Sequence, residues 1–141
     1  MSEFLMLGWN VAIPEVDIGD DIFVVQDDNG TLRRVQVKTS ISTPRSDGYS
    51  AQFNVSVKNL RNITNIIVHY VFIVRCHDGW SKPVIIRQDF LLDLFENDSV
   101  GSANAGNITF YFSYAHGSVK CSGQNFTKYV NDFSDFPLIQ H

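Results

Sequence analysis

The residues best suited to chemistry lie in the first forty positions. Asp21 follows an acidic loop that contains Gly19, and Gln36 and Lys38 alternate with valines in a later strand-like segment. A carboxylate and an amide carbonyl supply the hard oxygen atoms that Mg²⁺ or Mn²⁺ prefers. An ammonium group beside them can orient a water molecule or stabilise developing negative charge. These residue types therefore indicate metal-assisted hydrolysis of a phosphodiester bond.

A hairpin predicted around Asn29-Gly30 would bring these residues together, because Asn-Gly between two strand-like runs is a strong signal for a two-residue turn. In that register the cross-strand pairs are Asp21 with Lys38, Phe23 with Gln36 and Val25 with Arg34. Paired residues share a face of the hairpin. One face would then carry Asp21, Arg34, Gln36 and Lys38, and the other would carry Ile22, Val24, Val35 and Val37 as core. A longer or bulged loop would change this register.

The alternative interpretation of the same pattern is a cross-strand salt bridge between Asp21 and Lys38 on a solvated face. Such a pair contributes only ~0–1 kcal/mol to stability and has no chemical role.

A family resemblance favours the catalytic interpretation. The stretches Gly-Trp-Asn-Val-Ala-Ile-Pro (8–14), Gly-Asp-Asp-Ile-Phe-Val-Val (19–25) and Arg-Val-Gln-Val-Lys-Thr-Ser (34–40) resemble the PD-(D/E)xK endonuclease superfamily. The resemblance implies that Asp21 binds metal, that Gln36 stands at the acidic position of the motif and that Lys38 is the catalytic lysine. Asp20 competes with Asp21 for the metal-binding role. It further implies Mg²⁺ or Mn²⁺ as cofactor, DNA as partner and, by analogy, a homodimer.

The chain departs from the family pattern in two places. Gln36 replaces an acidic residue, which removes one negative charge from the metal site. The family also has a helical glutamate about three turns before the glycine, a position that falls before Met1 here, and Glu3 is the helical acid that remains. These departures leave a second hypothesis, a catalytically inactive nuclease-fold protein that serves as an interaction or regulatory module.

Composition sets wider limits on the function. The chain has 141 residues, of which 44% are hydrophobic and 18% charged, so residues 1–141 are expected to form a single globular domain. A net charge of −4 argues against strong non-specific binding to nucleic acid. No signal peptide or membrane-spanning run is evident, so a cytoplasmic protein with reduced thiols at Cys76 and Cys121 is expected. Asn-x-Ser/Thr triplets, the first at Asn54, keep a secreted glycosylated domain as a third, weaker hypothesis.

The hydrophobic pattern predicts an α/β fold, and the resemblance specifies it as a restriction-endonuclease-like core with a mixed central β-sheet flanked by helices. Helices are expected over 2–7, within 58–65, over 88–95 and over 125–133. Strands are expected over 9–14, 22–26, 31–40, 51–57, 66–76, 84–87 and 108–114, with loops over 43–48 and 77–83.

Three groups of residues outside the motif have both a structural and a functional interpretation. His69 and Tyr70 interrupt an apolar strand, where a satisfied core histidine is the simpler explanation than a ligand. The aromatic residues of 110–114 fit a core strand, although a base-stacking platform would have the same composition. Basic side chains near the hairpin and the loops after it could contact phosphates or form a solvated face, namely Arg33, Arg34, Arg45, Lys58 and Arg61.

Overall fold

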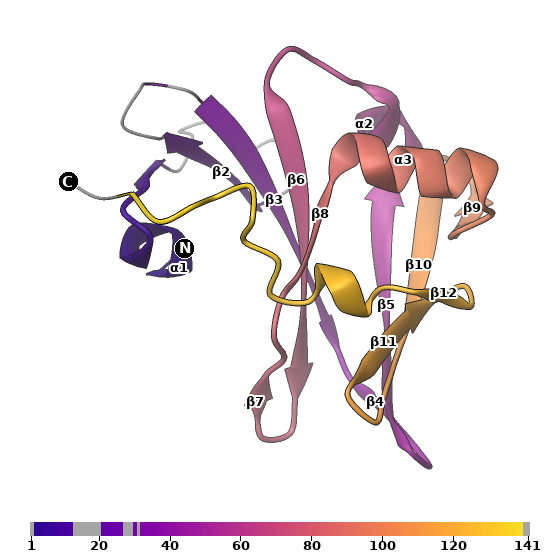
Figure 1. The fold of residues 1–141 in the computed structure, drawn as a ribbon. Coiled ribbons are helices and arrows are strands. Elements are labelled where there is room, and N and C mark those ends of the chain that lie inside the picture. Colours follow the sequence, from indigo (N-terminus) through magenta and orange to yellow (C-terminus); the bar gives the residue numbers. More distant parts are fainter. Residues whose placement is uncertain (1, 13–20, 27–29, 31, 140–141) are drawn as a thin grey trace.

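The computed structural model describes residues 2–12, 21–26, 30 and 32–139, with Ala12 and residues 21–26 described by their backbone alone. Within these residues the strands form two sheets, named sheet A and sheet B here, and the helices are few and short (Figure 1). The predicted α/β class is confirmed at this level. No helix in the described part of the chain is long and apolar enough to cross a membrane.

Sheet A contains the N-terminal motif. Its strands are β1 (Asn10–Ala12), β2 (Asp21–Gln26), β3 (Leu32–Ile41), β6 (Ile67–Cys76), β7 (Gly79–Trp80) and β8 (Val84–Arg87). The order is β1-β2-β3-β6-β7, with β8 also paired to β6. Because β3 is antiparallel to β2 and parallel to β6, the sheet is mixed. The apolar run of β6 predicts burial on both faces, and Tyr70, Val71 and Phe72 are all buried.

Sheet B is antiparallel throughout its described strands. They are β4 (Thr43–Arg45), β5 (Gly48–Ser56), β9 (Ser102–Asn104), β10 (Asn107–Ala115), β11 (Ser118–Cys121) and β12 (Gln124–Asn125), in the order β12-β11-β10-β5-β4 with β9 also on β10. Two-residue turns at Ala105-Gly106, His116-Gly117 and Ser122-Gly123 join neighbouring strands, and both residues of each turn have positive φ. This backbone matches the right-handed twist of the flanking strands, and glycine makes it accessible.

The predicted helix over 125–133 is wrong. That segment contains the end of β12 and a short 3₁₀ helix, η1 (Thr127–Tyr129). The Asn125 side chain accepts a hydrogen bond from the Thr127 backbone N–H at 2.9 Å, and the Thr127 hydroxyl accepts one from the Val119 backbone N–H at 3.0 Å. Such side-chain bonds to the backbone compete with helix formation. The predicted loop over 43–48 is also corrected, since it begins with β4.

Aromatic rings fill the main core between the two sheets. Phe72 of sheet A contacts Phe53 and Phe112 of sheet B, with ring centroids 4.9 and 5.2 Å apart. Leu60 of α2 (Val57–Arg61) and Leu91 of α3 (Gln88–Asn97) belong to the same buried cluster. Figure 1 shows both helices at one end of the sheets, where they close this core. The predicted helix over 88–95 and the short helix within 58–65 are thus confirmed.

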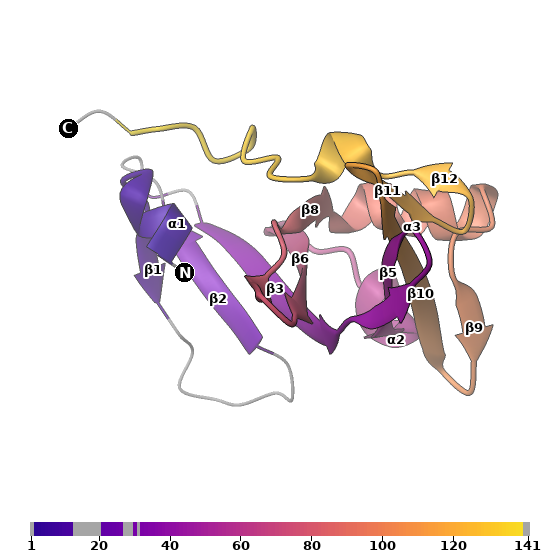
Figure 2. The same cartoon turned by 90° about the horizontal axis from the view of Figure 1, so that it is seen from below.

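A second core lies on the opposite face of sheet A. Phe4 of α1 (Ser2–Met6), Trp9 and Phe136 pack there against Val35 and Val71. The chain leaves α1 at Gly8, which has φ of 88°, as expected for the residue that ends a helix. The C-terminal segment returns to α1 (Figure 2), where the Ile139 N–H donates to the Leu7 carbonyl at 2.8 Å. Both faces of β3 are therefore covered by distant parts of the chain.

Candidate functional site

The hairpin that carries the motif has a different register from the one expected. Asp21, the first residue of β2, is paired with Val37, and Ile22 is paired with Gln36. The predicted pairing of Asp21 with Lys38 is therefore wrong by one residue, as are the pairings of Phe23 with Gln36 and Val25 with Arg34. The physical reason is the length of the connection: Gln26 pairs with Leu32, so residues 27–31 join the strands in place of a two-residue turn.

This change of register alters which residues share a face, because side chains alternate along a strand. Val35 and Val37 pack into the second core, whereas Gln36 lines a pocket on the face of sheet A that carries the main core. Val37, the residue that pairs with Asp21, lies between Gln36 and Lys38 in β3. Asp21 therefore lies opposite the part of β3 that contains Gln36 and Lys38. Its pairing partner, Val37, belongs to the face of the second core, whereas Gln36 belongs to the face of the main core.

Gln36 is the most enclosed residue of the motif, with 5% of its surface exposed. It borders a polar pocket of about 130 Å³ whose other lining residues are Arg34, Asn59, Asn62, Thr64, Val68, Tyr70 and Gln88. The Gln88 amide nitrogen donates to the backbone carbonyls of Asn59, Leu60 and Asn62 at 2.9, 3.0 and 3.1 Å. These bonds satisfy the carbonyls at the end of α2 and hold one wall of the pocket in place.

Lys38 lies two residues further along β3, half-buried and paired with Phe72 of β6. Arg34 is exposed and lines the Gln36 pocket, so Arg34 and Gln36 share a face as the sequence predicts. Glu3 lines a different cavity of about 350 Å³, together with Val37 and Thr39 on the opposite face of β3. A backbone hydrogen bond is the main cause that lowers the pKa of the Glu3 carboxyl. The structure thus does not bring Glu3 to Gln36 and Lys38.

The described residues hold few candidate metal ligands. No group of three or more His, Cys, Asp or Glu side chains lies close enough to hold an ion within the described ranges. The candidates that remain are the Gln36 carbonyl oxygen and the adjacent carboxylates Asp20 and Asp21, of which Asp20 lies outside the described residues and Asp21 is described by its backbone. Oxygen ligands of this type suit Mg²⁺ or Mn²⁺.

His69 is buried against Phe136 of the second core, as the structural interpretation of the sequence predicts, but it is not fully satisfied, because its Nδ1 atom has no hydrogen-bond partner among the described residues. It is 2% exposed, and its Nε2 atom lies 2.9 Å from Oδ2 of Asp135. Burial lowers the pKa of His69, although the Asp135 carboxylate acts in the opposite direction. Arg33 donates to the Asp135 carbonyl and lies over the Phe136 ring, with 5.4 Å between the guanidinium carbon and the ring centroid. No local signal in the sequence links residues 135–136 to sheet A.

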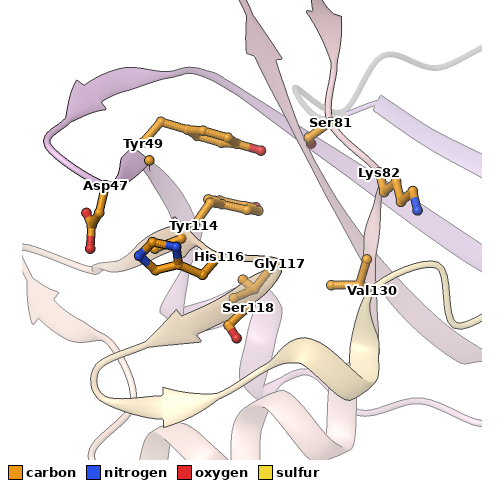
Figure 3. A pocket seen from close by; sticks show the side chains of 12 residues that line it. Asp47, Tyr49, Ser81, Lys82, Tyr114, His116, Gly117, Ser118 and Val130 are labelled. Atoms are coloured by element: carbon orange, nitrogen blue, oxygen red, sulfur yellow. The ribbon is translucent and has the colours of Figure 1, made fainter.

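A third cavity, of about 290 Å³, lies at the end of sheet B, beside the chain that leads into β8 (Figure 3). The rings of Tyr49 and Tyr114 stack with centroids 4.5 Å apart and an interplanar angle of 13°. The Tyr114 hydroxyl is buried and has no hydrogen-bond partner among the described residues. Cys121 is buried nearby, and desolvation raises its pKa to about 11. Both cysteines are free thiols, as expected.

Comparisons with models of protein families, with curated proteins and with solved structures found no match for this chain. The function is therefore inferred from the residues and their geometry.

Proposed function

We propose that this chain is a metal-dependent DNA endonuclease of the PD-(D/E)xK type, with its site at the start of β2 and the middle of β3. The observation that supports the proposal is that β2, which begins at Asp21, is the antiparallel neighbour of the part of β3 that carries Gln36. A mixed sheet in which β3 has an antiparallel and a parallel neighbour also agrees with the central sheet that the sequence resemblance implies.

Each residue has a defined task in this proposal. A carboxylate at the start of β2 and the Gln36 carbonyl oxygen would hold the divalent ion, which supplies a hydroxide near neutral pH and neutralises developing charge. Lys38 would position the attacking water or stabilise the charge on the phosphate oxygens. Arg34, exposed beside the Gln36 pocket, would contact a neighbouring phosphate. A homodimer on DNA is part of the proposal by analogy with the superfamily.

Because of this register, the first question for experiment is whether Asp20 or Asp21 binds the metal ion. Ile22 pairs with Gln36, whereas Asp21 pairs with Val37. Asp20 lies outside the described residues, and Asp21 pairs with a residue of the face opposite to Gln36, so each carboxylate needs its own test. Replacing each by asparagine removes the charge with little change of size and tests them separately.

The second candidate function is an inactive nuclease-fold protein that acts as an interaction or regulatory module. It is favoured by the one-residue difference in register, which places the partner of Asp21 on the opposite face from Gln36 and Lys38. In that case the Asp–Lys pattern contributes to the stability of the sheet only.

Cleavage of supercoiled plasmid with Mg²⁺ or Mn²⁺ separates the two candidates. An active site predicts metal-dependent nicking that Lys38→Ala reduces by about 10²–10⁴-fold. One of Asp20→Asn and Asp21→Asn should have a comparable effect. Lys58→Ala, which removes an exposed lysine from α2, is the matched control and should cleave normally. Absence of both nicking and Mn²⁺ uptake by the unchanged chain would reject the endonuclease and leave the inactive module.

A further inference from the structure

The outward face of sheet B has an unusual charge distribution. The residues that alternate with the inward-facing positions of its strands are polar except for Gly48 and Ala115 at one end: Thr43, Arg45, Ser50, Gln52, Asn54, Ser56, Ser102, Asn104, Asn107, Thr109, Tyr111, Ser113, Ser118, Lys120 and Asn125. We call these residues the outer surface of sheet B. Its charged members, Arg45 and Lys120, are both basic, although the chain as a whole has 15 acidic and 11 basic residues. A surface of this kind attracts anions locally.

An aromatic ring lies near the middle of this surface in a fixed position. Tyr111 is 36% exposed and paired with Gln52 of β5. Arg45 donates from Nη2 to the Tyr111 hydroxyl at 2.8 Å and from Nε to the Ser50 hydroxyl at 3.0 Å. Ser50 is only 2% exposed, so this network is anchored in the sheet. A ring held in place before binding loses little conformational freedom when a ligand stacks on it.

A shallow depression of about 560 Å³ extends from Tyr111 to the end of the sheet. Its lining includes Arg45, Ser113, His116 and Lys120. Asp47, in the turn between β4 and β5, is the acidic residue of that lining. The volume lies within the roughly 300–1,000 Å³ that small-ligand sites occupy. Basic groups therefore lie on both sides of an exposed aromatic ring, in a hollow large enough for a nucleotide.

A solvated antiparallel sheet also has a polar outer face, but ordinary solvation does not require that the charged residues of its strands, Arg45 and Lys120, both be basic, nor that an exposed ring be held by one of them. Those features match the requirements of single-stranded nucleic acid: a π-face for base stacking, cations for the backbone, and short polar side chains for sugar and base edges. Duplex DNA, whose bases are already stacked, would not use the ring.

We propose that the outer surface of sheet B binds single-stranded nucleic acid, with a base stacked on Tyr111 and phosphates contacted by Arg45 and Lys120. This binding site lies on a different sheet from the proposed metal site, so neither proposal requires the other.

Fluorescence anisotropy of a labelled oligothymidylate, roughly 12 nucleotides long to span such a surface, tests the proposal in EDTA. Binding should weaken as salt increases, with a slope of about −1.4 in log K against log [salt] for two phosphate contacts on a single strand. Tyr111→Ala should weaken binding by about 5- to 150-fold, the usual range for the loss of one base stack. Arg45→Gln combined with Lys120→Gln should nearly abolish the salt dependence.

The chain offers matched controls. Phe90 of α3 is 51% exposed and lies under Arg87, with 5.0 Å between the guanidinium carbon and the ring centroid, so Phe90→Ala removes an exposed aromatic of similar environment. Lys128→Gln removes an exposed lysine from η1. Both variants should bind as the unchanged chain does. Lys38→Ala should also retain binding, even where it abolishes cleavage.

Either of two kinds of outcome would overturn the proposal, namely the absence of binding or binding of the wrong specificity. The first is no detectable binding of the single strand at low salt, which would leave the surface as a solvated sheet face. The second is a loss of affinity in Phe90→Ala equal to that in Tyr111→Ala, or tighter binding of a duplex of the same length. Failure of plasmid cleavage would not affect this result, because the anisotropy measurement needs no metal ion.

Discussion

Sheets A and B differ in how their strand pairings are specified. In sheet B, most neighbouring strands are joined by two-residue turns such as His116-Gly117, so those registers are fixed by residues beside them in the sequence. The exception is the pairing of β5 with β10, which forms only after the chain has passed through α2, β6, β7, β8, α3 and β9. In sheet A, β3 pairs with β6 only after the chain has passed through β4, β5 and α2. Loop closure of that kind depends on contacts far apart in the sequence. Local turns thus determine most pairings of sheet B, whereas contacts between distant segments determine its β5–β10 pairing and the β3–β6 pairing of sheet A.

The two sheets also differ in how many of their faces are covered. Sheet B buries one face and exposes the other, which gives its strands a regular alternation of buried and exposed residues. Sheet A is packed on both sides, by sheet B and by α1 with the C-terminal segment. The candidate metal site lies on β2 and β3, whose register is hard to infer locally, and the proposed nucleic-acid surface includes the long-range pairing of β5 with β10, where Tyr111 pairs with Gln52.

The largest expected effect comes from removing the ring that joins the sheets. Phe112 of β10 is fully buried and contacts the Phe53, Phe72 and Phe126 rings. Phe112→Ala should lower the free energy of unfolding by about 3–5 kcal/mol, since it removes buried area and leaves a cavity. Urea denaturation measures this change.

The matched control is Phe90→Ala on the exposed side of α3, which should change stability by less than about 0.5 kcal/mol. A loss below about 1 kcal/mol for Phe112→Ala would contradict the common core between the sheets. A second unfolding transition in that variant would show that the two sheets can unfold separately.

A smaller effect is expected from the polar contact that ties α2 to α3. Gln88→Ala removes the donor for the carbonyls of Asn59, Leu60 and Asn62. The Asn59 carbonyl keeps the Asn62 N–H as a donor, but the buried bond to the Leu60 carbonyl and the part-buried bond to the Asn62 carbonyl are lost, which should reduce the free energy of unfolding by about 1–3 kcal/mol. Gln124→Ala, at an exposed position of β12, should leave stability unchanged. Equal stability of the two variants would show that water replaces the Gln88 amide.

The two sheets also show how far sequence patterns can predict this fold. The strands over 66–76 and 108–114 and the helix over 88–95 were predictable, because hydrophobic periodicity is a local property. The His-Gly and Ser-Gly turns at residues 116–117 and 122–123 carry a usable signal for hairpins, and with it β11 and β12 could have been found in place of a C-terminal helix.

The register of β2 and β3 could not be obtained in the same way. The Asn-Gly signal at residues 29–30 suggested a two-residue turn, but the strands pair from Gln26 and Leu32. The shift of one residue is enough to separate the partner of Asp21 from the face of Gln36. The contacts of His69 with Asp135 and of Trp9 with Pro137 have no local signal, because they join residues far apart in the chain.

A pH-dependent effect tests the C-terminal cover of sheet A. Burial holds the pKa of His69 below the value of about 6.5 in an unfolded chain. As pH falls below about 6.5, the unfolded state binds the proton first, so the free energy of unfolding should decrease by up to about 1.4 kcal/mol per pH unit. The decrease ends once pH passes the lowered pKa of the folded state. Asp135 opposes this shift, whereas Arg33 and Arg87 reinforce it.

Thermal denaturation across roughly pH 7.5 to 5.5 measures this dependence. His69→Gln should show a smaller decrease than the unchanged chain, and His116→Gln, at an exposed turn of sheet B, should show the same decrease as the unchanged chain. A steeper loss in His69→Gln would mean that protonated His69 stabilises the C-terminal segment through Asp135.

The smallest expected effect concerns the inner face of sheet B. Tyr114 is buried, and its hydroxyl has no partner among the described residues. Tyr114→Phe removes this polar group and keeps the ring that stacks on Tyr49, so the free energy of unfolding should stay the same or rise by up to about 1 kcal/mol. Tyr49→Phe is the matched variant. Burial, followed by a hydrogen bond with the Cys76 side chain, raises the pKa of Tyr49 to about 12.

Because Tyr49→Phe removes a hydroxyl that has a partner, its free energy of unfolding should fall by about 0.5–1 kcal/mol. The two variants differ only in which stacked ring loses its oxygen, so their difference isolates the hydrogen bond from the packing. A loss of more than about 1 kcal/mol in Tyr114→Phe would show that an ordered water molecule satisfies that hydroxyl. The stability of this end of sheet B would then depend on a bound water molecule, just as the stability of sheet A depends on contacts with residues far away in the sequence.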